Sequence, residues 1–165
     1  MFINYTFDEI FDDFGRKYKH NIYEQYPHLL NVNIHYCYSN QYSQLDNVPV
    51  IEFLDNDLFA FSCCRNKDTN RVDAYIIYSP DNCNSLNLTT EEKYAAISHE
   101  IGHIIHFFNE SLNGQPEIIH ELKADEVVSF LGLSNPLSNL LSKLITSNYY
   151  TEYQKQSMKK RRMFL

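Results

Sequence analysis

The chain has 165 residues, of which 44% are hydrophobic and 15% aromatic, and its formal net charge is −7. This length and apolar content suit one folded domain and argue against disorder. The acidic balance disfavours nucleic-acid binding, which needs a basic surface. No stretch approaches the roughly 20 apolar residues of a membrane-spanning helix, and residues 1–9 lack a signal-peptide pattern. We therefore expect a cytoplasmic protein with no membrane partner and no nucleic-acid partner.

The first half of the chain predicts one helix followed by strands. Thr6 and Glu9 have the spacing of a capping box, and apolar residues recur at helical spacing from Phe7 to Tyr18. This helix is expected to end near Tyr26-Pro27. The predicted strands are Val32–Tyr38, Val48–Leu54, Leu58–Cys64 and Arg71–Tyr78, with a hairpin turn at Asp55-Asn56-Asp57 between the second and the third.

The second half of the chain predicts helices only. Thr89 and Glu92 have the spacing of a second capping box, which opens a long helix with an apolar stripe. Pro116 suits the first turn of the next helix, and Gly132 suits its C-terminal cap. Two shorter helices are expected at Pro136–Ser147 and Thr151–Arg162.

Because strands and helices are segregated along the chain, the predicted class is α+β. We expect an N-terminal helix, a sheet of about four strands that is mixed or antiparallel, and helices after it. The predicted organisation is a single domain, 1–165, in three parts. These are a helix-and-sheet half at 1–88, a pair of helices with the candidate chemistry at 89–133, and a short helical C-terminal part with a basic end at 134–165.

The strongest chemical signal is His99-Glu100-Ile101-Gly102-His103, an HExxH pattern inside a predicted helix. Residues i and i+4 lie one above the other on a helix face, so His99 and His103 can share one ion. Zinc–nitrogen distances of about 2.0–2.1 Å require that convergence. Glu100 lies about a quarter-turn around the helix, where it can take a proton from a water beside the metal. Gly102 is a poor helix former, and we expect a neighbouring element to pack closely against it.

A catalytic zinc has three protein ligands and an open position, so a third ligand must come from another segment. Glu121 and Asp125 share a face of the next predicted helix, where Ala124 is small enough for close helix packing. Glu121 is the predicted third ligand, and Asp125 is expected to hydrogen-bond a ligand histidine and fix its tautomer. Glu117, one turn earlier on the same face, is the alternative ligand. The non-functional interpretation is a solvated acidic face.

The sequence HEIGH at 99–103, followed by ExxAD at 121–125, resembles the gluzincin metallopeptidases. Among them it is most similar to the small minigluzincin and ImmA/IrrE-like groups, over residues 89–133. The resemblance implies a zincin-like fold and a Zn²⁺ cofactor. It also implies that the zinc ligands are His99, His103 and Glu121, with Glu100 as the catalytic residue and Asp125 behind the ligands.

The same resemblance implies where substrate and transition state are bound. The last strand before the motif helix, Arg71–Tyr78, would be an edge strand that holds a protein or peptide substrate by strand addition. Gluzincins commonly stabilise the oxyanion with a Tyr or His that follows this region. Tyr149, Tyr150 and Tyr153 are the candidates here, although none lies in a recognisable motif.

The C-terminal end is basic, in contrast to the acidic balance of the chain. Cations in the last turn of a helix suit the helix dipole, which is the simplest interpretation. A basic tail that folds onto an acidic cleft, and so restrains activity, is the alternative. The residues concerned are Lys155, Lys159, Lys160, Arg161 and Arg162.

Three hypotheses follow for function. The first is a zinc peptidase that hydrolyses peptide bonds through a zinc-activated water, with Glu100 as general base. The second is a binding or regulatory protein on a zincin scaffold, for example one encoded by a phage or mobile element, with a metal site but no general peptidase activity. The third is an α+β domain in which HExxH occurs by chance and no metal binds.

Overall fold

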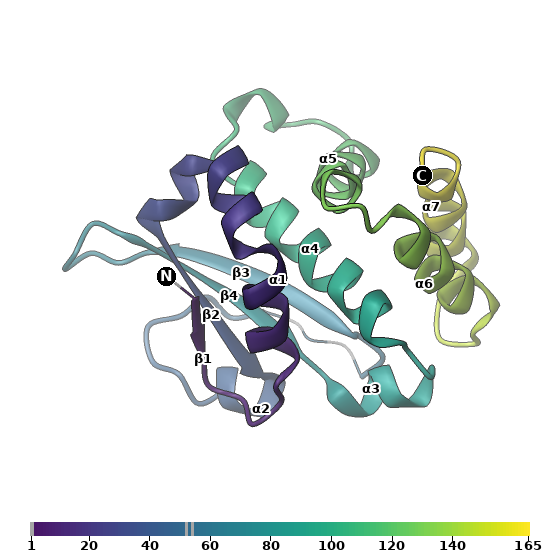
Figure 1. Cartoon of the computed structure of the whole chain (residues 1–165), viewed down its shortest axis with the longest axis horizontal. Coiled ribbons are helices and arrows are strands. Elements are labelled where there is room, and N and C mark those ends of the chain that lie inside the picture. Colours follow the sequence, from purple (N-terminus) through teal and green to yellow (C-terminus); the bar gives the residue numbers. More distant parts are fainter. Residues whose placement is uncertain (1, 52, 54) are drawn as a thin grey trace. The chain divides into compact units, whose positions relative to one another are not determined.

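The structure is a computed structural model that describes residues 2–51, 53 and 55–165 (Figure 1). Within these residues the chain forms seven α-helices and one four-stranded mixed sheet, so the predicted α+β class is confirmed. The chain divides into two compact units, 1–81 and 82–165. None of the helices in the described part combines the length and the apolar character that crossing a membrane requires.

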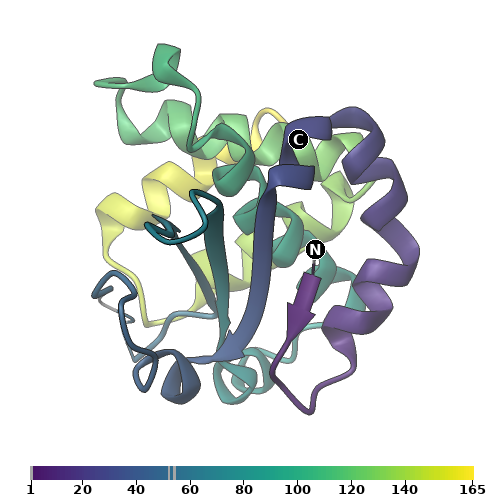
Figure 2. The ribbon, with the colours of Figure 1, turned by 90° about the vertical axis from the view of Figure 1, so that its left-hand side faces the viewer.

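The first unit contains the sheet, whose strand order is β1-β2-β4-β3 (Figure 2). Strand β2 pairs in parallel with both β1 and β4, whereas β3 and β4 pair antiparallel through the loop at 66–71. Strands β1 and β3 are therefore the outer strands of the described sheet. The bounds are Phe2–Asn4 for β1, Val32–Tyr38 for β2, Phe59–Arg65 for β3 and Val72–Tyr78 for β4.

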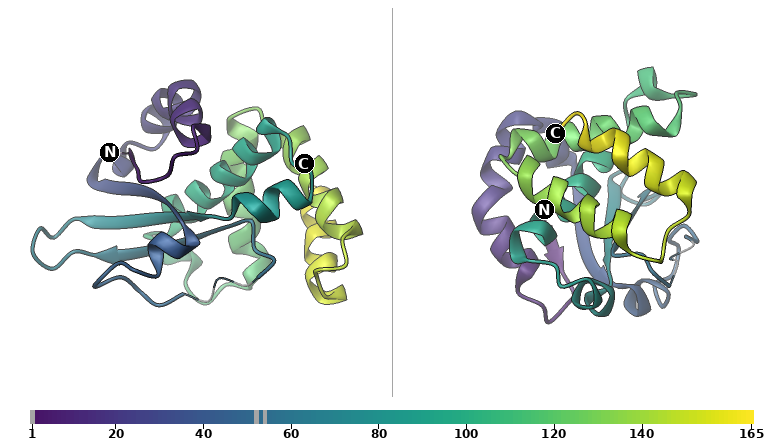
Figure 3. Two further views of the ribbon diagram at one scale, coloured as in Figure 1. Left: turned by 90° about the horizontal axis from the view of Figure 1, so that it is seen from below. Right: turned by 90° about the vertical axis from the view of Figure 1, so that its right-hand side faces the viewer.

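Helix α1 (Ile10–Gln25) covers one face of the sheet (Figure 3, left), and a short 3₁₀ turn, Pro27–Asn31, leads from it into β2. Phe11 fixes this packing, since its ring stacks on Tyr36 at 4.2 Å and meets Tyr78 edge-on at 5.5 Å between centroids. The opposite face carries a second apolar cluster around helix α2 (Ser39–Tyr42). The buried members of that cluster are Cys37, Tyr42 and Ile77.

Two sequence predictions for the sheet are wrong. The described residues of Val48–Leu54 form no strand, while Glu52 and Leu54 lie outside the described residues. Pro49 cannot donate a ladder hydrogen bond, and Val50 is fully exposed. The turn at Asp55-Asn56-Asp57 consequently joins no pair of strands. The fourth strand is instead β1, which is too short for its periodicity to be recognised.

The predicted edge strand is also wrong. Strand β4, which corresponds to Arg71–Tyr78, lies between β2 and β3 and has both of its edges paired. The hairpin that leads into it is closed by a bond of 2.7 Å from the Asn66 amide to the Arg71 carbonyl. Strand addition to the described sheet can therefore use β1 or β3, but not β4.

The start of α1 differs from the predicted capping box. The Thr6 hydroxyl donates to Asn4 Oδ1 at 2.7 Å, so it does not cap the helix. Asp8 Oδ1 instead accepts the Ile10 amide at 3.0 Å, and the helix begins at Ile10. Phe7 precedes the helix and is 96% exposed, which removes it from the predicted core stripe.

The second unit is helical and follows the predicted pattern closely. Thr89 and Glu92 form the expected capping box, and Gly132 adopts the left-handed conformation (φ 76°) expected after a helix end. Helices α4 and α5 pack together, and α6 and α7 lie side by side (Figure 3, right). The bounds are Pro80–Ser85 for α3, which crosses from the first unit, Thr90–His106 for α4, Glu117–Phe130 for α5, Ser134–Thr146 for α6 and Glu152–Arg162 for α7.

Candidate metal centre

The site is built on a close approach between α4 and α5. A Cβ atom on Gly102 would lie 2.6 Å from the Ala124 carbonyl oxygen and 2.7 Å from its Cα. No side chain larger than hydrogen fits there without movement of the backbone. Ala124 is fully buried at this crossing, as expected from its size. The approach brings the face of α5 that carries Glu121 and Asp125 onto the histidine face of α4.

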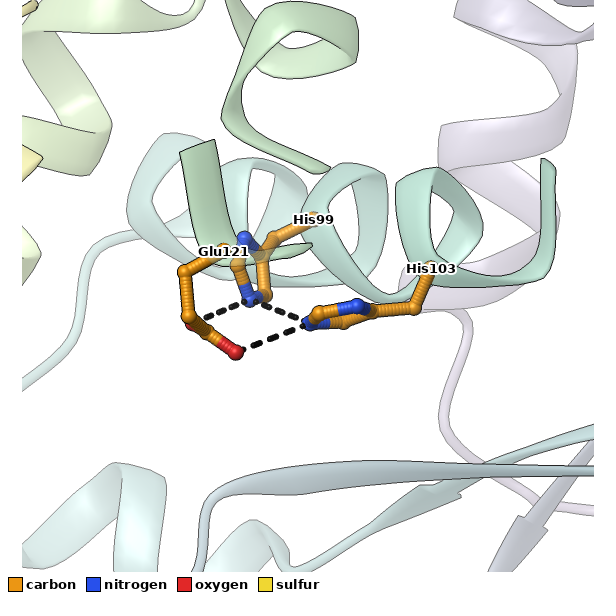
Figure 4. Close-up of side chains that lie close together, drawn as sticks. All are labelled: His99, His103 and Glu121. Atoms are coloured by element: carbon orange, nitrogen blue, oxygen red, sulfur yellow. Dashed lines mark hydrogen bonds and ion pairs between the residues drawn. The ribbon is translucent and has the colours of Figure 1, made fainter. Parts of the chain in front are cut away.

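Three side chains from these helices converge on one point (Figure 4). The Nε2 atoms of His99 and His103 lie 3.1 Å apart. Glu121 completes the triangle, with Oε2 at 3.2 Å from His99 Nε2 and Oε1 at 3.2 Å from His103 Nε2. These three residues could hold a metal ion. A tetrahedral zinc with bonds of about 2.0–2.1 Å places its ligand atoms about 3.3 Å apart, so the spacing fits zinc.

Asp125 determines which nitrogen of His99 faces this point. Its Oδ1 lies 2.7 Å from His99 Nδ1, and both side chains are buried. A proton on Nδ1 donates to this carboxylate, which leaves the Nε2 lone pair free for a metal. The predicted hydrogen bond between Asp125 and a histidine of the motif is therefore present, and its role behind a metal ligand stays a prediction.

Arg161, at the end of α7, reaches the same carboxylates. Its Nε donates to Asp125 Oδ2 and its Nη2 to Asp125 Oδ1, both at 2.8 Å, and its Nη1 lies 3.0 Å from Glu121 Oε2. Sequence reasoning did not assign Arg161 to the site. The available signals were the basic C-terminal end and the acidic pair on α5, but neither selects one cation out of five.

The charges of the site depend on one another. Burial alone would raise the pKa of Glu121, but His99, His103 and Arg161 hold it well below the usual range. Burial also opposes ionisation of Asp125, yet hydrogen bonds from His99 and Arg161 lower its pKa. For His99, burial and the Arg161 charge lower the pKa, but Glu121 and Asp125 outweigh them and raise it to about 9 without a metal. Both carboxylates would therefore be ionised when a metal ion binds, and His99 would have to release a proton to become a ligand.

Glu100 follows His99 on α4 and is partly buried. Burial raises its pKa above that of an ordinary glutamate, against the opposing charges of His99 and His103. It is not one of the three residues that converge on the possible metal position. Glu100 is thus close enough to interact with the site electrostatically, without serving as one of its ligands.

The remaining sequence candidates are Glu117 and the tyrosines near the C-terminal end. Glu117 is exposed and is not part of the His99–His103–Glu121 group, which argues against it as the third ligand. Tyr149 and Tyr153 are 51% and 76% exposed. The choice among the tyrosines as oxyanion partner stays a prediction.

Replacing Gly102 with Ala tests the close approach directly. We expect the free energy of unfolding to fall by about 3 kcal/mol, the upper end for overpacking, because the new methyl group meets backbone atoms. The same change should weaken metal binding, since α5 must move away.

Gly15→Ala is the matched control, because Gly15 lies in α1 with nothing within 4 Å of an added Cβ. It should stabilise the protein by about 0.5–1 kcal/mol. Chemical denaturation measures both, and an unaffected Gly102→Ala variant would contradict the packing.

Comparisons with protein-family models, with curated proteins and with solved structures find no match to this chain.

Proposed function

We propose that this chain is a zinc-dependent peptidase of the gluzincin type with a zincin-like fold. The observation that supports the proposal is the convergence of His99, His103 and Glu121 at spacings of 3.1–3.2 Å. Two histidines and one glutamate form a ligand set of catalytic zinc sites, which keep the fourth position open. The Asp125 contact to His99 adds the outer hydrogen bond that such ligands almost always have.

The chain's own residues account for the proton transfers of hydrolysis. A zinc ion, when bound, supplies Lewis acidity that polarises a carbonyl and lowers the pKa of water. Glu100 accepts a proton from the attacking water as the water oxygen bonds to the scissile carbonyl carbon. It then donates that proton to the leaving amine as the C–N bond breaks. A raised pKa makes Glu100 a stronger base than an exposed glutamate, which suits this role.

The proposed partner is a protein or peptide substrate, and the proposed location is the cytoplasm. An extended substrate could add to the sheet only at β1 or β3, since both edges of β4 are paired.

Metal removal tests the proposed function. The purified protein should contain one zinc per chain by elemental analysis and should cleave members of a proteome-derived peptide library, detected by mass spectrometry. Treatment with a chelator should abolish cleavage, and added zinc should restore it. Protein that is folded and fully loaded with zinc, yet cleaves no peptide in the library, would overturn the peptidase proposal in favour of a binding or regulatory role.

A further inference from the structure

Arg161 is the charged side chain of α7 that contacts the candidate metal centre. It is 8% exposed, whereas its basic neighbours Lys159, Lys160 and Arg162 are exposed. A guanidinium group stays protonated in proteins, so this is a buried positive charge that needs partners. Its burial therefore has a specific cause that the rest of the basic end does not share.

The guanidinium uses all three of its nitrogens on two carboxylates. Its Nε and Nη2 form a two-pronged contact with the two oxygens of Asp125, each at 2.8 Å. Its Nη1 lies 3.0 Å from Glu121 Oε2, the same oxygen that faces His99 Nε2. Because the group is planar and rigid, it fixes the two carboxylates relative to each other.

We propose that Arg161 is a positioning residue of the metal centre, which makes the end of α7 part of the site. It would hold Glu121 in its ligand orientation and hold Asp125 against His99 Nδ1. This inference rests on the metal centre of the proposed function, although not on peptide hydrolysis. It also gives one residue of the basic end a structural role, while a restraint on activity by this end stays a prediction.

Charge and geometry make opposite predictions for the loss of Arg161. Removing a positive charge near a cation site should tighten metal binding, whereas releasing two carboxylates should weaken it. Three contacts at 2.8–3.0 Å are lost together, and partners behind metal ligands typically contribute 10–100-fold to affinity. We therefore expect the loss of geometry to outweigh the loss of charge, so that zinc binding weakens.

Zinc affinity, measured by competition with a chromophoric chelator, distinguishes these two predictions. We expect Arg161→Met to weaken zinc binding by about 10–100-fold. Arg161→Lys keeps the positive charge, but a single ammonium group cannot make the two-pronged contact with Asp125. The zinc affinity of Arg161→Lys should therefore lie closer to that of Arg161→Met than to that of wild type. The visible spectrum of the cobalt-loaded variants should change, because the ligand geometry changes. Arg162→Met, an exposed neighbour on the same helix, should bind zinc like wild type.

Each outcome decides the proposal. Wild-type affinity in Arg161→Lys would mean that charge alone matters, and tighter binding in Arg161→Met would mean that charge dominates; either result overturns it. If circular dichroism shows that Arg161→Met does not fold, two other variants test the proposal. These are Arg161→Lys alone and Arg161→Lys combined with Asp125→Asn, and the zinc affinity of each is measured. Arg161→Lys should then cost much less in the Asp125→Asn background, whereas additive effects would overturn the proposal. A wild-type protein that binds no zinc would instead overturn the metal centre itself, and this inference with it.

Discussion

Glu100→Gln is expected to retain zinc and to lower the rate of peptide hydrolysis by about 10²–10⁴-fold, the usual contribution of general acid–base catalysis. The amide is nearly the same size as the carboxylate, and Glu100 is not one of the three converging residues, so the metal ligands are undisturbed. An amide cannot accept the proton of the attacking water. The measurement is kcat for the best peptide from the library, together with zinc content per chain.

A control on the same helix separates loss of the base from a general change of charge. Glu91 lies in the first turn of α4 and is exposed. Glu91→Gln should therefore leave both hydrolysis and zinc content at wild-type levels. Hydrolysis at the wild-type rate by zinc-loaded Glu100→Gln would eliminate Glu100 as the general base, while leaving the metal centre intact.

Glu121→Ala is expected to have the largest effect on the metal itself. It removes the only carboxylate of the converging group. Residues that hydrogen-bond metal ligands typically cost up to roughly 100-fold in metal affinity when mutated, and loss of a ligand itself should lower zinc affinity by more than that. Asp125 keeps its two bonds to Arg161 in this variant, so the helices should remain packed. The chelator competition assay measures the affinity, and circular dichroism checks the fold.

Glu117 supplies the matched control, one turn earlier on α5. Glu117→Ala removes an exposed carboxylate from the same helix and should leave zinc binding unchanged. The reverse pattern, with zinc retained by Glu121→Ala and lost by Glu117→Ala, would move the third ligand to the sequence alternative. Zinc retained by both variants would place the third ligand outside α5.

Local sequence signals predicted the helical half of the chain well. The capping box at Thr89 and the left-handed Gly132 depend on residues within a few positions of one another, so their patterns can be recognised directly. The close contact at Gly102 was also expected, because a glycine inside a stable helix needs a packing reason. Only the identity of the neighbour, Ala124 of α5, required the structure.

The sheet was predicted less well, since strand pairing is not local. The alternation in Val32–Tyr38 predicted β2 at its observed bounds. Nothing in the Arg71–Tyr78 pattern distinguishes an interior strand from an edge strand, because that depends on which strands lie on either side. The apolar run around Pro49 has strand composition, but proline lacks the amide that a ladder needs.

The same distinction applies to the candidate site. Helical periodicity alone places His99 and His103 on one face of their helix, because residues i and i+4 lie one above the other. It also places Glu121 and Asp125 on one face of the following helix. Periodicity does not show that these two faces meet, since their meeting depends on the packing of Gly102 against Ala124. Arg161, 36 residues beyond Asp125, joins the site through the docking of α7, a contact too distant in sequence for any local pattern to indicate.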